Sequence, residues 1–178
     1  MEKTVEKNKV VKQIIEDLKS SEEKVVLKSL TKIKDKGKTS VITPLFSLFE
    51  STSNDKYRSE IKNIFSNIKD SYALDLFVEK LSSGSNELNE VLLFSLWNSN
   101  LNAVDFIPEV VESAIRGNYM VALEALIVLE NLDGPFSNEK LEESRYLINE
   151  YFAEGPDEKL DLIKSILDVV LGLEDSAI

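Results

Sequence analysis

Residues 42–69, ITPLFSLFESTSNDKYRSEIKNIFSNIK, contain two apolar-patterned segments separated by a short polar break. The apolar residues of the second segment recur at intervals of three and four, the stripe of a helix that packs one face inward: Ile61, Ile64, Phe65 and Ile68. The break, Ser53-Asn54-Asp55, consists of residues that favour the N-cap of a helix. Because short connections place sequential helices antiparallel, this region predicts a helical hairpin.

The same pattern extends to both ends of the chain. Short clusters of Gly, Pro, Ser, Asn and Asp divide it into segments of helical periodicity, and no segment of comparable length alternates strictly as a strand would. The sequence therefore predicts an all-α fold. The expected helices are about ten in number: roughly 4–19, 22–36, 39–51, 55–69, 71–82, 87–99, 103–116, 118–132, 138–153 and 157–172.

An internal repeat underlies these segments. Leu30 and Ile33 reappear 64 residues later as Phe94 and Trp97, and 96 residues later as Leu126 and Leu129, which corresponds to a period of 32. Pro44 likewise has a counterpart at Pro108, and both are expected in the first turn of a helix, where a missing N–H is tolerated. A period of this length with two helices per unit indicates a solenoid of stacked helix pairs.

The hairpin at residues 42–69 resembles the HEAT-like repeats of the armadillo-type α-α superhelix. Residues 43–49 are similar to the family's Pro-Leu first helix, Asn54 to Arg58 to its Asp-x-x-Arg turn, and Ile61, Phe65 and Ile68 to its apolar second helix. The resemblance implies an α-solenoid that forms a single domain over residues 1–178. It does not imply any specific activity. It would group the chain into about five antiparallel helix pairs: 4–36, 39–69, 71–99, 103–132 and 138–172.

The residue inventory argues against most catalytic chemistry. The chain has no histidine and no cysteine, so it lacks the commonest general base, the usual nucleophile triads and the usual ligands of zinc, iron and copper. We therefore expect no catalytic residue, no metal site and no cofactor. The 32 acidic residues leave open an enzyme that uses carboxylates, but clusters such as Glu142-Glu143, Asp157-Glu158-Asp161 and Glu174-Asp175 are typical of a solvated surface.

The charge of the chain is unevenly distributed. Residues 1–70 contain 15 Lys and Arg against 11 acidic residues, whereas residues 71–178 contain 6 against 21. The acidic second part would repel nucleic acid and anionic lipid, so neither is an expected partner. The sequence also shows no export signal and no apolar stretch long enough to span a bilayer, which together with the lack of cysteine predicts a cytoplasmic protein.

Two segments, 87–99 and 118–132, are apolar on more than one face and contain no Lys or Arg. Burial in the middle of the stack explains such a pattern. The alternative follows from the HEAT-like resemblance, which implies that second helices line the concave face. Trp97, Met120 and Glu124 would then form an apolar floor with one carboxylate, suited to an amphipathic helix or extended peptide of another protein.

The predicted function is thus a non-catalytic scaffold or adaptor that binds a basic or amphipathic segment of another protein. A self-associating structural module is an alternative, because the end helices of an open stack, 4–19 and 157–172, expose part of an apolar face or pair with another copy. The oligomeric state expected is a monomer or a weak homo-oligomer. An enzyme that uses carboxylates is the third alternative.

Overall fold

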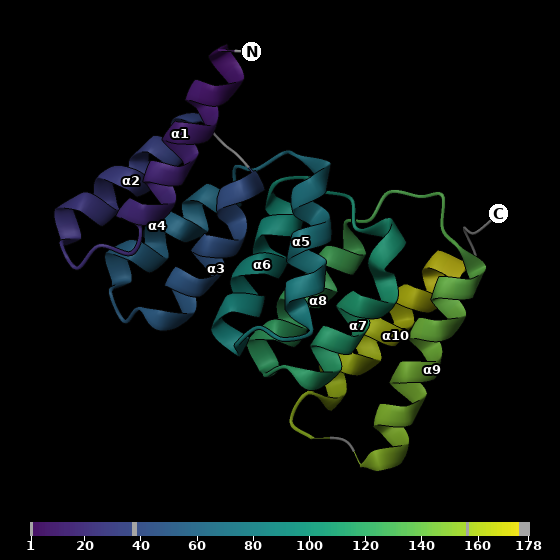
Figure 1. The fold of residues 1–178 in the computed structure, drawn as a ribbon. Helices are drawn as coiled ribbons and strands as arrows, with labels where there is room; N and C mark the ends of the chain where they lie inside the picture. The colour runs from purple at the N-terminus through teal and green to yellow at the C-terminus, as the bar shows by residue number, and fades with distance from the viewer. Residues whose placement is uncertain (1, 37–38, 156, 175–178) are drawn as a thin grey trace. The chain divides into compact units, whose positions relative to one another are not determined.

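The computed structural model describes residues 2–36, 39–155 and 157–174, with side chains from residue 9 to 33 and from residue 39 onward. Within this part of the chain every regular element is helical (Figure 1). Two short 3₁₀ helices, η1 (Thr39–Val41) and η2 (Val104–Phe106), directly precede α3 and α7. The α-helices are α1 (Glu2–Asp17), α2 (Glu23–Lys36), α3 (Ile42–Ser51), α4 (Asp55–Phe65), α5 (Ser71–Leu81), α6 (Asn86–Asn98), α7 (Ile107–Arg116), α8 (Tyr119–Glu130), α9 (Asn138–Glu154) and α10 (Leu160–Glu174).

The predicted all-α class is confirmed, and most helix boundaries lie within three residues of those predicted. The polar breaks act as N-caps: the side chains of Asn54, Ser85 and Asn118 accept backbone N–H groups in the first turns of α4, α6 and α8. The segment predicted at 55–69 is an exception, because α4 ends at Phe65. There Asn67 donates its side-chain amide to the Asn63 carbonyl, 2.7 Å away, and such local bonds compete with the continuing helix.

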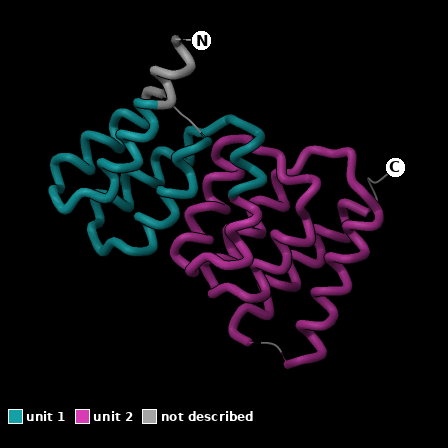
Figure 2. Tube along the Cα trace, in the orientation of Figure 1, with its two compact units in different colours: residues 1–76 teal, residues 77–178 magenta. Residues whose placement is uncertain are grey.

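The chain divides into two compact units, residues 1–76 and residues 77–178 (Figure 2). In the first unit α2 packs against both α1 and α4, and α3 packs against α4. Its core includes Leu30, Leu45, Ile61 and Phe65, all fully buried. Arg58 fixes the α3–α4 connection, since its Nε donates to the Thr52 carbonyl at 3.0 Å and its guanidinium lies 5.0 Å from the centre of the Phe49 ring.

In the second unit the helices alternate between two layers. In one layer α8 packs against both α6 and α10, and in the other α7 packs against α9. Contacts between α7 and α8 and between α9 and α10 join the layers, so each helix packs mainly on helices one or two places away along the chain. This arrangement is compatible with a helical repeat. None of the helices described is long and apolar enough to cross a membrane.

Two glycines of the second unit should respond to alanine in opposite directions. A Cβ at Gly117, between α7 and α8, would lie 2.5 Å from Val121 Cγ1 and 2.8 Å from the Ser113 carbonyl, so Gly117→Ala should destabilise the unit by about 2 kcal/mol. A Cβ at Gly172, inside α10, would have no other atom within 4 Å. Gly172→Ala should therefore stabilise the unit by about 0.5–1 kcal/mol, because alanine has the higher helix propensity. Urea unfolding followed by circular dichroism measures both changes, and equal effects would contradict the packing described.

Candidate functional site

One side of α8 remains partly exposed although three helices pack around it. The side chains that face α6, α7 and α10 are buried: Val121, Ala122, Ala125, Val128 and Leu129. On the remaining side Met120 is 42% exposed, and Leu123, Glu124 and Ile127 are half-buried. The spacing of these four residues, at i, i+3, i+4 and i+7, places them on one side of the helix. We refer to Met120, Leu123, Glu124 and Ile127 as the α8 face.

The adjacent helix α6 adds two half-buried aromatic side chains, Phe94 and Trp97. Their rings meet edge to face with centroids 5.0 Å apart. The indole Nε1 of Trp97 donates a hydrogen bond of 2.8 Å to Oε2 of Glu124. The charge-assisted bond and the ring contact hold the indole in one orientation beside the α8 face.

The structure therefore brings two of the three predicted site residues into direct contact. Trp97 and Glu124 are hydrogen-bonded across two helices, and Met120 lies one turn before Glu124 on the same side of α8. Glu124 differs from expectation in one respect: it is a half-buried acceptor for the indole instead of a freely solvated carboxylate. Burial accounts for most of the apolar run of α6, because Val91, Leu92, Leu93 and Leu96 all lie in the core.

A pocket of about 400 Å³ opens where the α8 face ends. Trp97 forms part of its wall, so the pocket and the α8 face share this side chain. The remaining lining comes from the C-terminal ends of α6 and α8 and from the loops that follow them. Five of these nine residues are polar, and the two charged ones, Glu130 and Asp133, are both acidic. The nine are Leu96, Asn100, Leu101, Asn102, Val128, Glu130, Asn131, Leu132 and Asp133.

The pocket wall is held by backbone geometry that the sequence explains. After α6, the Asn100 and Leu101 N–H groups donate to the Trp97 and Leu96 carbonyls, a Schellman motif whose left-handed position is occupied by Asn100 with φ 53°. Asn102 joins the two loops, since its Nδ2 donates to the Asp133 carbonyl at 2.6 Å and its Oδ1 accepts the Asp133 N–H at 3.3 Å. The positive φ is therefore a helix cap that asparagine tolerates.

A second polar cluster involves Lys159, directly before α10, whose side chain is 4% exposed. Its ammonium donates to the carbonyls of Ala114, Ile115 and Gly117, at 3.2, 2.6 and 2.6 Å, and so caps the C-terminus of α7. Nothing in the sequence distinguishes this lysine from the solvated ones, and sequence reasoning missed it. The ammonium also lies 3.6 Å from Oδ2 of Asp157 and 5.9 Å from the centre of the Tyr151 ring, and these contacts within the chain indicate a structural role.

Asp157 and Tyr151 complete this cluster. The Tyr151 hydroxyl donates to Oδ1 of Asp157 at 2.6 Å, and the Lys159 N–H donates to the same oxygen at 2.9 Å. The hydrogen bond from Tyr151, followed by that from the Lys159 backbone, lowers the pKa of the Asp157 carboxyl. Burial, followed by the bond to Asp157, raises the pKa of the Tyr151 hydroxyl. These shifts arise from contacts within the fold and do not indicate a reaction.

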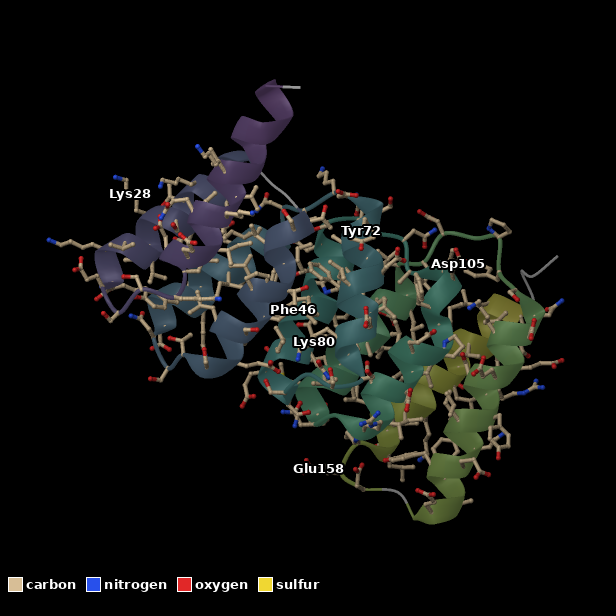
Figure 3. The ribbon with its side chains drawn as sticks, in the orientation of Figure 1. Lys28, Phe46, Tyr72, Lys80, Asp105 and Glu158 are labelled. Carbon is tan, nitrogen blue, oxygen red and sulfur yellow. The ribbon has the colours of Figure 1, made fainter. Side chains whose placement is uncertain are left out.

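Two of the three acidic clusters seen in the sequence lie at the surface, whereas Glu174 of the third is half-buried and accepts a hydrogen bond of 3.1 Å from Arg145. Glu142, Glu143, Asp157 and Asp161 are exposed, and Glu158 lies in the exposed connection before α10 (Figure 3). In residues 2–36, 39–155 and 157–174, no group of three or more acidic side chains is arranged so that it could hold a metal ion. Asp175 lies outside the described residues.

No family model matches the chain, and comparisons with curated proteins and with solved structures find no match. The HEAT-like resemblance therefore rests on the residues of the chain, and the packing of the described helices is compatible with a helical repeat.

Proposed function

We propose that this protein is a non-catalytic scaffold or adaptor, built as a HEAT-like α-α superhelix, that binds a basic or amphipathic segment of another protein. The proposed binding surface comprises the α8 face together with Trp97 and Phe94 of α6. In this proposal the layer that contains α6, α8 and α10 forms the concave side of the stack. The cytoplasm is the proposed location, and no metal or cofactor takes part.

The observation that carries the proposal is the hydrogen bond between Trp97 and Glu124. A tryptophan held in place but still partly exposed is a suitable anchor for a partner, because little side-chain entropy remains to be lost on binding. Met120, which is flexible and exposed, can adapt to a partner's apolar side chain. The surface is therefore preorganised at its centre and adaptable at one end.

The charge around the surface favours a basic partner. Between Lys80 and Lys140 the sequence contains a single basic residue, Arg116, and its guanidinium lies 3.4 Å from the Glu112 carboxylate. The same interval contains nine acidic residues. An excess of negative charge raises the association rate of basic segments and disfavours acidic ones.

Photo-crosslinking from position 120 tests this proposal. A photoreactive phenylalanine analogue at Met120, expressed in the native cells, should form a covalent adduct with a partner whose crosslinked peptide is basic or amphipathic. The matched control carries the same analogue at Tyr146 of α9, which is 62% exposed, and should not trap that partner. Identical adducts from both positions would contradict the proposed surface.

The same experiment separates the alternatives. An adduct between two copies of the chain at position 120, with a mass above one chain in light scattering, would favour the self-associating module. No adduct with any protein at position 120 would contradict the scaffold proposal and leave the carboxylate-based enzyme to be considered.

A further inference from the structure

We propose that the pocket beside Trp97 receives an arginine side chain of the bound partner. This inference rests on the proposed function and adds a specific subsite to it. The pocket lies at the C-terminal end of α8, so it continues the line of the α8 face from Glu124 through Ile127 to Asn131. A segment that lies along this face would therefore place a side chain in the pocket.

The pocket presents acceptors that have no partner within the described part of the chain. Glu130 and Asp133 line it and are exposed, and among the described residues neither carboxylate forms a hydrogen bond or ion pair. Asn131 uses its Nδ2 as a donor to the Ile127 carbonyl at 2.8 Å, which leaves its Oδ1 as an acceptor. Two negative charges and an amide oxygen around one pocket indicate a cationic group with several donors.

Arginine fits this lining better than lysine or a metal ion. Its planar guanidinium has five N–H donors, can reach several acceptors at once and stacks on aromatic surfaces such as the Trp97 ring. A lysine ammonium offers three donors around one point. A volume of about 400 Å³ with two carboxylates is too large and too poor in anionic ligands for a bare metal ion, which requires a tight shell of oxygen atoms.

The spacing along α8 also specifies the ligand. Met120 and Asn131 are eleven residues apart, which corresponds to about 17 Å along the helix at about 1.5 Å per residue. The partner should therefore carry an apolar side chain for the Met120 end and an arginine about 17 Å away from it.

Nuclear magnetic resonance on the whole chain tests the pocket without the partner. The chain has one tryptophan, so the single indole N–H signal reports on Trp97. N-acetyl-L-arginine N-methylamide should shift this signal and the Asn131 side-chain amide signals in a saturable way. The citrulline counterpart, which is neutral and of similar shape, should bind at least tenfold more weakly. Equal shifts with both probes would overturn the proposal.

Variants assign the binding to the pocket. Glu130→Gln combined with Asp133→Asn should raise the Kd for the arginine probe at least tenfold, and an unchanged amide spectrum would show that the fold is intact. Met120→Ser, outside the pocket, should change this Kd less than twofold. An unchanged Kd in the double variant would overturn the arginine subsite. The crosslinking at Met120 would still decide the proposed function, so the two failures are distinguishable.

Free L-arginine separates a protein side chain from a small metabolite. If the pocket contacts only the side chain, free L-arginine and N-acetyl-L-arginine N-methylamide should bind with similar Kd values. Tenfold tighter binding of the free amino acid would show recognition of its amino and carboxylate groups and would overturn the assignment to a partner protein.

Discussion

Lys159→Met should lower the free energy of unfolding of the second unit by about 3 kcal/mol, the largest effect on stability that we expect. Methionine keeps the apolar length of the lysine but cannot donate a hydrogen bond. The Ala114, Ile115 and Gly117 carbonyls at the end of α7 would lose the ammonium that they share. Buried acceptors without a donor each cost about 1–3 kcal/mol, and partial access of water reduces the sum.

Lys164→Met is the matched control for this variant. Lys164 lies on α10 and contacts Asp161 at 3.3 Å, but both side chains are largely exposed. Exposed ion pairs contribute about 0–1 kcal/mol, so its loss should hardly change stability. Urea unfolding monitored by circular dichroism compares the two variants, and similar midpoints would show that Lys159 does not stabilise the end of α7.

Glu124→Lys should weaken binding of the crosslinked partner at least tenfold, the largest effect on binding from a single charge. The change removes the acceptor of the Trp97 indole and replaces the carboxylate nearest the aromatic anchor with a cation that repels a basic ligand. We expect a smaller effect on stability, about 1–2 kcal/mol, from the lost hydrogen bond.

Glu124→Gln separates the two roles of this residue. The glutamine carbonyl can still accept the indole N–H, so the folding free energy should change by less than about 1 kcal/mol. Affinity should fall by less than in Glu124→Lys, because the charge is lost but not reversed. Titration calorimetry and thermal unfolding measure both variants. A drop of several kcal/mol in Glu124→Lys with unchanged affinity would assign Glu124 to packing alone.

The helices of this chain are predictable from sequence because their signals are local. Apolar spacing and the caps at Asn54, Ser85 and Asn118 depend on neighbours within one or two turns, and the structure confirms the helices that they delimit. Part of the candidate site can be picked out from the sequence for the same reason. Two segments that are apolar on more than one face contain Trp97, Met120 and Glu124. In the structure Trp97 and Glu124 are in contact.

The features that were missed depend on long-range contacts. Lys159 reaches carbonyls more than 40 positions away in sequence, and Asn102 joins a loop 31 residues further on. No local pattern marks either residue, because a lysine or asparagine in a polar connection is typical of solvent-exposed sequence. The pocket has the same origin, since the ends of two non-consecutive helices form it.

The affinity of Trp97→Ala for the crosslinked partner shows whether the surface formed by α6 and α8 binds a protein. Tyr146→Ala removes an exposed aromatic side chain of α9 outside the proposed surface and serves as the control. We expect at least a tenfold rise in Kd for Trp97→Ala and a change below twofold for Tyr146→Ala, with both variants still helical by circular dichroism. A Kd for Trp97→Ala equal to that of the unmodified protein would contradict this expectation.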